Sequence, residues 1–264
     1  MSEVPASWAS CQVRDVLASD PRAILTGPFG ATLGKADFRE TGVPLLTIGA
    51  LGQGQIRNDK ILFVAEEKAE ELADYRLQFN DILFSRMGTV GRCSVINDDH
   101  KGSLFNYHII RLRVNHAATT PYFLKYYFQG AEQVGSYLRE VNRGVTRAGV
   151  NTSLLAEMPL SLPPLAEQRR IVAKLDRLFA RTARARAELD KAAKLGSTAS
   201  ANGSLIDRLD AQLLAKAFRG ELVPQDPDDE PAAVLLDRIR AERAATPKPR
   251  GGRRGAKDRA ASAS

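Results

Sequence analysis

The sequence has few of the residues from which metal sites are built. Its 264 residues include two cysteines, Cys11 and Cys93, and three histidines, at positions 100, 108 and 116. The cysteines lie far apart, and neither belongs to a pair with the spacing of zinc ligands. We therefore expect no metal site and a protein that resides in the reducing environment of the cytoplasm.

Long apolar runs are also absent. No stretch of about 18 consecutive apolar residues, the length that indicates a membrane span, occurs in the chain. Residues 1–15 lack the basic and apolar pattern of a signal peptide. These two absences predict a protein with no membrane partner.

Motifs of nucleotide-binding and catalytic sites are incomplete. In the glycine-rich loop 26–35, the spacing from Gly30 to Lys35 is one residue too short for a phosphate loop, and Ala36 replaces the magnesium-binding hydroxyl. Residues 162–165 (LPPL) resemble the proline-containing motif of DNA amino-methyltransferases, but they offer no amide, carboxylate or aromatic group to hold a base. We expect a binding protein that is not an enzyme and has no cofactor of its own.

Positive charge is concentrated in the C-terminal part of the chain. Residues 1–166 contain 17 basic and 17 acidic residues, whereas residues 167–264 contain 21 and 14, so the net charge of +7 arises entirely from the second segment. A basic excess favours a polyanionic partner such as nucleic acid. If the N-terminal part also binds nucleic acid, it must use a few locally clustered cations.

Residues 1–160 have the pattern of an α+β domain. Short runs of β-branched and aromatic residues, bounded by Gly, Asn or Asp, are typical of strands. We expect one small mixed or antiparallel sheet, with strands near 8–16, 43–48, 61–64, 82–84, 93–96 and 109–114. Composition predicts helices at 65–75 and 121–139, the second with a proline at its start.

A long helix is predicted from Glu167 to Leu195. Apolar residues recur in it at alternating spacings of four and three, which is typical of a coiled-coil seam, and a second helix at 205–218 continues the pattern. The expected seam consists of Ile171, Leu175, Leu178, Ala185, Leu189, Leu209 and Leu213. Residues 196–204 are polar and glycine-rich, so we expect a break there. The two helices then form either a hairpin or the two arms of an interrupted rod.

The domain boundaries follow from these patterns. We expect a folded domain at 1–160, a helical spacer and dimerisation region at 161–223, and a turn with a short helix at 224–244. The basic tail at 245–264 has no core-forming residues and is expected to be disordered.

Several stretches resemble the specificity (S) subunits of type I restriction–modification systems. Residues 159–178 (PLSLPPLAEQRRIVAKLDRL) and 213–243 (LLAKAFRGELVPQDPDDEPAAVLLDRIRAER) are similar to the conserved helical region of that family and the segment after it. Four further stretches resemble its target-recognition domain: TGPFGATL (26–33), GVPLLTIGALGQGQI (42–56), NDILFSRMGTVGRCSVI (80–96) and RGVTRAGVNTSLLAEMPL (143–160). The resemblance covers about residues 4–243.

The resemblance implies a non-catalytic subunit that reads double-stranded DNA. Such subunits recruit methyltransferase (M) subunits, which bind S-adenosylmethionine, and a restriction (R) subunit, which uses ATP. They usually carry two recognition domains, and this chain has one, so a homodimer formed by two antiparallel seams is the natural reconstruction. The alternative is a truncated S fragment that acts only as an interaction or regulatory protein, by dimerising or by competing for the M subunit.

Side chains that contact DNA are expected in four loops. Arginines flanked by glycines allow the backbone to approach phosphate while the guanidinium reaches a guanine edge. Hydroxyl, amide and aromatic groups suit phosphate contact, hydrogen bonding and stacking. The candidates are Asn142, Arg143, Thr146 and Arg147; Ser85, Arg86, Thr89 and Arg92; Asn106, Tyr107 and His108; and Thr32 and Lys35. The alternative for the loop with Arg143 and Arg147 is a solvated loop, and the alternative for Arg86 is an ion pair with Asp81 or with an acidic residue of a helix.

Overall fold

The computed structural model describes residues 4–245 except 31, 53, 147 and 195–199. The basic tail from residue 246 onward, Arg147 and residues 196–199 of the expected helix break therefore lie outside the described residues. No helix in the described part of the chain is long and apolar enough to cross a membrane.

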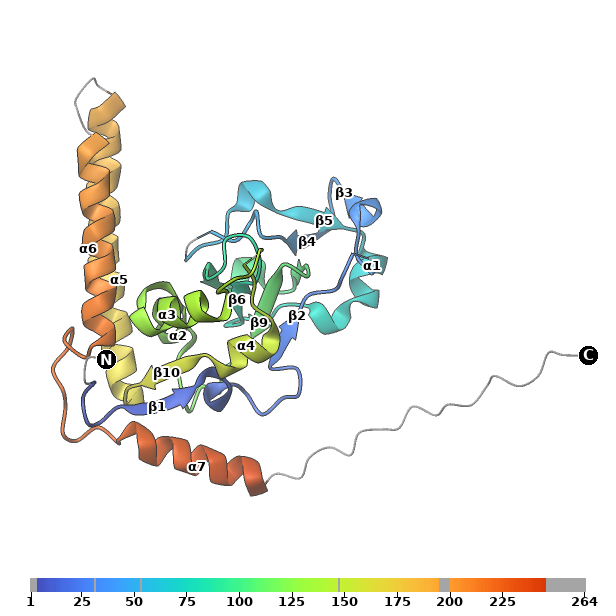
Figure 1. Cartoon of the computed structure of the whole chain (residues 1–264). Helices are drawn as coiled ribbons and strands as arrows, with labels where there is room; N and C mark the ends of the chain where they lie inside the picture. The colour runs from blue at the N-terminus through green and yellow to red at the C-terminus, as the bar shows by residue number, and fades with distance from the viewer. Residues whose placement is uncertain (1–3, 31, 53, 147, 195–199, 246–264) are drawn as a thin grey trace, which may run out of the picture.

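Three small sheets build the N-terminal domain, where the sequence pattern predicted one (Figure 1). The central sheet is antiparallel and has the order β2 (Ile24–Thr26), β9 (Ile109–Leu112), β6 (Ile82–Ser85) and β7 (Cys93–Val95). The second is mixed, with the order β3 (Phe38–Arg39), β5 (Leu62–Val64), β4 (Val43–Leu46) and β8 (Leu104–Phe105). The third pairs β1 (Ala9–Gln12) with β10 (Pro159–Leu162). The α+β class is confirmed.

The central sheet is buried on both faces because its side chains alternate between two cores. In β6, Ile82 and Phe84 face the larger core, whereas Leu83 belongs to the smaller one on the other side. Successive side chains of a strand point to opposite faces, so a continuous apolar run is what a two-sided core requires. The ends of β6 and β9 are thus held rigidly, and the loops that follow them start from fixed positions.

Helices cover one side of the central sheet. Where the sequence predicted one helix, the structure has two. The expected helix at 121–139 divides into α2 (Pro121–Gly130) and α3 (Glu132–Val141), with Ala131 in an extended conformation between them. A Cβ on Gly130 would lie 2.3 Å from Cβ of Leu214, so only glycine lets the C-terminal helices approach this closely. The remaining short helices are α1 (Glu66–Glu71), as expected, and α4 (Thr152–Glu157), which was not.

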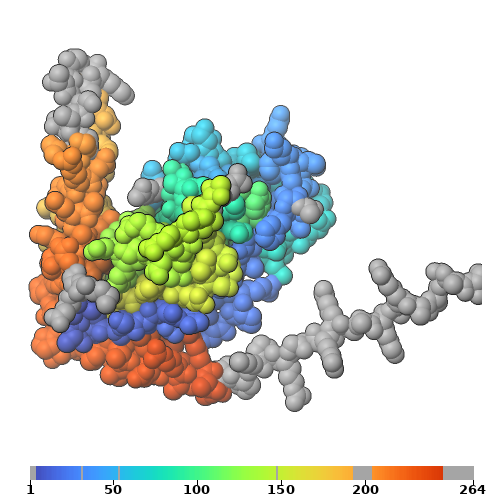
Figure 2. Space-filling model, in the orientation of Figure 1, coloured from blue at the N-terminus to red at the C-terminus, as the bar shows by residue number. Residues whose placement is uncertain are grey.

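The two long helices form a hairpin. Helices α5 (Leu165–Lys194) and α6 (Ser200–Phe218) lie side by side as a rod along one side of the sheet domain (Figures 1 and 2). Arg186 of α5 bonds to Asp207 of α6 at 2.6 Å across the pair. Because α6 already begins at Ser200, the break is shorter than the predicted 196–204, and the straight interrupted rod is excluded.

The expected seam lies inside this one chain. Ile171 and Leu175 are fully buried in the large core with α2 and α6, and Leu213 packs against the same core. Ile171 and Leu175 are therefore not available to a second copy, and their prediction as dimer contacts is wrong. The other seam positions become more exposed along the rod: Leu178 and Leu189 are half-buried, Ala185 is exposed and Leu209 is 45% exposed.

A polar cluster joins Trp8, before β1, and Gln225, after α6, to Glu167 at the base of the rod. The Trp8 indole donates to both carboxylate oxygens of Glu167 at 3.1 Å, and the Gln225 amide donates to the same carboxylate at 2.6 Å. Burial raises the pKa of the Glu167 carboxyl, and the hydrogen bonds from Gln225 and Trp8 oppose that shift. Arg170 adds a two-pronged ion pair with Asp229.

The last helix, α7 (Ala232–Ala245), runs along the base of the domain beside β1 (Figure 1). It buries Leu235, Leu236 and Ile239 in the large core. The sheet domain and the helical region therefore share one core, and the helices hold the sheet domain in a fixed orientation on the rod.

Candidate nucleic-acid interface

Three of the four loops that the sequence singled out meet at one edge of the central sheet. The Arg86 amide donates to the His108 carbonyl at 3.0 Å, and the Val150 amide donates to the Arg86 carbonyl at 2.8 Å. Met87 and Gly149 form an isolated β-bridge. The loops at 86–92, 106–108 and 142–150 are thus one hydrogen-bonded surface, although they lie far apart in the sequence.

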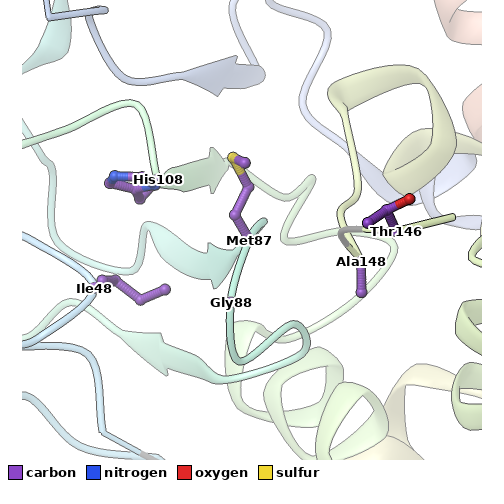
Figure 3. Close-up of a pocket in the computed structure, with 6 residues that line it drawn as sticks. All are labelled: Ile48, Met87, Gly88, His108, Thr146 and Ala148. Carbon is purple, nitrogen blue, oxygen red and sulfur yellow. The ribbon is translucent and has the colours of Figure 1, made fainter.

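A hollow of about 390 Å³ lies where these loops meet (Figure 3). It is lined by Ile48, Met87, Gly88, His108, Thr146 and Ala148. Thr146 and His108 were expected at a DNA surface, whereas the apolar residues were not, because single apolar residues in loops carry no periodic signal. The hollow therefore combines apolar walls with a hydroxyl and an imidazole.

In the 142–150 loop, one candidate anchors the loop and two point outward. The Asn142 side chain donates to the Leu138 carbonyl at 2.8 Å and accepts from the Gly149 amide at 2.7 Å. Its amide is therefore engaged within the protein, and its predicted role as a base reader is corrected to a loop anchor. Arg143 and Thr146 are exposed. Within the described residues, the Arg143 guanidinium has no hydrogen bond or ion pair, which leaves it available to a ligand.

The turn between β6 and β7 is shaped by Ser85. This residue is fully buried, and its hydroxyl donates to the Thr89 carbonyl at 2.5 Å and accepts from the Arg92 amide at 2.9 Å. The prediction that Ser85 contacts DNA is wrong, because neither its position nor its hydrogen bonds leave it free to do so. Thr89 is exposed at the tip of this turn, and Arg92 is half-buried.

Arg86 does not form the alternative ion pair with Asp81. That carboxylate is buried and binds Arg113 instead, with Nε and Oδ1 2.7 Å apart. The Arg86 guanidinium donates to the Tyr107 carbonyl at 3.3 Å. Arg86 thus stabilises the 106–108 loop through this hydrogen bond and brings a positive charge to the edge of the site.

The glycine loop 26–35 is pressed against the 106–108 loop. A Cβ on Gly27 would lie 2.4 Å from the carbonyl of Asn106, so this contact requires glycine. The Asn106 side-chain oxygen accepts the His108 amide at 3.2 Å and shapes the second loop. Thr32 and Lys35 are exposed beyond the contact. All four candidate loops are therefore neighbours.

Two residues near the site were missed by the sequence reasoning. Arg57 donates twice to the Gly49 carbonyl, at 3.1 and 2.8 Å, and so places an exposed cation beside Ile48. Phe29 is an exposed aromatic residue in the glycine loop. An aromatic residue between glycines in a polar loop was the available signal for Phe29, while Arg57 had none.

We expect Arg143→Ala to weaken binding of the cognate DNA target by about 1–3 kcal/mol if the guanidinium reads a base edge. Fluorescence anisotropy with cognate and random duplexes measures the difference. The matched control is Lys101→Ala, which removes one exposed charge from the turn at the opposite end of β6 and β7. An equal loss on random DNA would instead assign Arg143 to phosphate contact.

Comparisons with known proteins identify the family of this chain. The family model for the type I restriction modification DNA specificity domain matches residues 28–192. The chain therefore belongs to the family of type I restriction–modification specificity subunits. It is 30% identical over 237 residues to the type I restriction enzyme EcoKI specificity subunit of Escherichia coli K12, which covers 85% of this chain and 48% of that protein.

Further relatives give the same result. The EcoBI specificity subunit of Escherichia coli is 25% identical over 251 residues, covering 92% of this chain and 49% of the relative. The crystal structure of the HsdS subunit from Thermoanaerobacter tengcongensis has the same fold, with a TM-score of 0.54 at 20% identity, covering 73% of this chain and 47% of that one. This chain thus spans about half the length of the curated relatives it matches.

Proposed function

We propose that this chain reads one half of a bipartite DNA target and recruits the modification and restriction subunits of a type I complex. The observation that carries the proposal is the convergence of the four candidate loops on one surface, with Arg143, Thr146, Thr89 and Lys35 exposed on it. Rigid strands position these loops, and the side chains at their tips are of the types that contact phosphates and base edges. The chain itself acts by binding and not by catalysis.

We further propose that two copies act together as a homodimer. Residues 28–192 match one specificity domain, and a two-fold dimer of this chain gives a symmetric pair of such domains. Because Ile171 and Leu175 are buried within the chain, the contact must use the outward face of the hairpin. Leu205 and Leu209, 57% and 45% exposed, lie one turn apart on that face.

The hairpin has the length that a spacer between two half-sites needs. Helix α5 contains 30 residues, which at about 1.5 Å per residue spans about 45 Å. One turn of DNA measures about 34–36 Å. A rod of this length separates two recognition domains by somewhat more than one turn and leaves an uncontacted spacer between their half-sites.

Chemistry in the complex would come from the partners. We propose that the M subunit binds S-adenosylmethionine and that the R subunit uses ATP, while this chain supplies neither group. In the described part of the chain, no cluster of three or more His, Cys, Asp or Glu residues is arranged to hold a metal ion.

The proposal is tested by expressing the chain with its cognate M subunit in a host that lacks other DNA methylation, followed by genome-wide mapping of methylated bases. We expect a bipartite motif, and a homodimer predicts that its two halves are inverted repeats. Expression of the M subunit alone is the control.

Two outcomes would contradict the proposal. If the M subunit methylates the same sites without this chain, the chain does not set specificity. If the chain binds the M subunit and suppresses methylation by a full-length S subunit, it is instead a regulatory fragment that competes for M.

A further inference from the structure

Phe29 presents an aromatic ring to solvent beside the candidate DNA-reading loops. Its side chain is 60% exposed, the largest exposure among the large apolar residues that the structure describes. Phenylalanine is among the residues most often found inside proteins. The backbone of Phe29 is nevertheless held in place, because its carbonyl accepts hydrogen bonds from the Thr32 and Leu33 amides at 2.8 and 3.0 Å. Phe29 therefore starts a defined turn and does not sit on a loose loop.

A second aromatic ring, that of Tyr107, packs against the Phe29 ring. Phe29 stacks on Tyr107, with ring centroids 5.8 Å apart and planes 23° apart, and Tyr107 lies against His108 at 3.9 Å. Arg86 holds the Tyr107 carbonyl, and the tight packing at Gly27 fixes the two loops together. The three rings thus form one aromatic cluster, in which Phe29 stacks on Tyr107, His108 is tilted against Tyr107, and Phe29 is the exposed member.

The surroundings of Phe29 favour a nucleic-acid ligand over a protein partner. A Cβ built on the neighbouring Gly30 would have no other atom within 4 Å. Packing inside the protein therefore does not require a glycine at this position. Thr32 and Lys35 in the same loop are exposed. Protein-binding sites are extended apolar patches, whereas a single ring beside a hydroxyl and a cation matches the alternation of bases and phosphates in DNA.

A flat apolar ring meets the face of a base only where two stacked base pairs separate. Proteins achieve this by inserting an apolar side chain as a wedge, which partly unstacks one base step and kinks the duplex. Pyrimidine–purine steps open most easily, so a wedge also selects sequence without hydrogen bonding to a base. A wedge needs a rigid backing, which Tyr107 and His108 supply here.

We propose that Phe29, backed by Tyr107 and His108, inserts into a base step of the DNA target and unstacks it. This inference rests on the proposed function, since it needs this surface to bind DNA. It adds indirect readout, through the ease of opening one step, to the direct contacts expected of Arg143 and Thr146.

The experiment uses the full chain in complex with its M subunit and duplexes of the mapped target in which 2-aminopurine replaces one base at a time, leaving out the methylated bases and their immediate neighbours, because methyltransferases flip their target base out of the stack. Unstacking raises the fluorescence of this base analogue. We expect the native chain to raise fluorescence at one step within each half-site. Phe29→Ala should abolish the rise and weaken cognate binding roughly 5- to 150-fold, the range for losing one stacked base. Phe29→Trp should preserve the rise.

The matched control is Phe79→Ala. Phe79 is 48% exposed and lies in the turn before β6, at the opposite end of that strand from Arg86 and Met87. It should leave both the affinity and the fluorescence unchanged. The inference is overturned if Phe29→Ala behaves like Phe79→Ala, or if the native complex binds its target with no rise at any position. If the native complex does not prefer the mapped target over random DNA, the proposed function fails instead.

Discussion

Leu175→Asp is expected to unfold the whole module. The leucine is fully buried where α5 packs against α2 and α6 in the large core. Removing such a side chain costs about 2–5 kcal/mol, and a buried carboxylate without a partner adds a further penalty of several kcal/mol. The total is comparable to the entire stability of a typical domain, about 5–15 kcal/mol. Circular dichroism during thermal unfolding should show loss of the cooperative transition.

The matched control is Leu209→Asp on the exposed face of α6. Because Leu209 is 45% exposed, its replacement should leave the melting temperature nearly unchanged. If the outward face of the hairpin is the dimer contact, light scattering should show a shift from the mass of two chains to that of one. A folded, monomeric Leu175→Asp protein would contradict the assignment of the seam to the interior of the chain.

Phe218→Ala is expected to release α6 from the recognition domain. The Phe218 ring packs edge-on against Phe123 and Tyr127, with centroids 5.8 and 5.2 Å away, and is almost fully buried. Truncating a buried phenylalanine costs about 3–5 kcal/mol, and here the lost contacts are those between α6 and α2. Hydrogen exchange should show α6 amides opening before those of β6 and β9.

Leu205→Ala provides the comparison for Phe218→Ala, because Leu205 lies on the same helix and is 57% exposed. Measured in the monomeric Leu209→Asp background, where the proposed dimer contact does not contribute to stability, its free energy of unfolding should change by less than about 0.5 kcal/mol. If Phe218→Ala were equally mild, α6 would not be anchored to α2, and the hairpin would not be fixed on the recognition domain as the structure shows.

Anchoring of the hairpin bears directly on the proposed function. Two recognition domains read two half-sites at a fixed spacing only if each is held rigidly on the rod. The shared core, the Trp8–Glu167–Gln225 cluster and the Arg170–Asp229 ion pair provide that rigidity. A domain joined to the rod by a flexible linker would tolerate variable spacers.

Several elements of the fold were predictable from neighbouring residues. Strands β4, β5, β6, β7 and β9 were found because each is a short apolar run between turn residues. The division between α2 and α3 was not, since the composition favours helix on both sides of Ala131 and does not mark the extended residue between them. The two-residue strands β3 and β8 were missed because they are too short to show alternation.

In the candidate site, too, residue types alone did not decide which side chains face solvent. The sequence identified four loops with the right composition, and the structure brings them together. Within those loops, both Ser85 and Arg143 were candidates by residue type. Burial and hydrogen bonds decide between them, because Ser85 stabilises a turn from inside while Arg143 faces solvent.

The sequence by itself determined the α+β class, the positions of most strands and helices, the seam spacing and the family. All of these follow from residue types and short-range periodicity, which act between residues close along the chain. Only the tertiary structure decided that the seam closes within one chain, that the helices form a hairpin and that four distant loops share one surface. Leu175 and Leu209 show the reason: both occupy seam positions, yet one is fully buried and the other is 45% exposed. Whether an apolar face of a helix is buried depends on the elements that pack against it. The spacing of residues within the helix does not identify those elements.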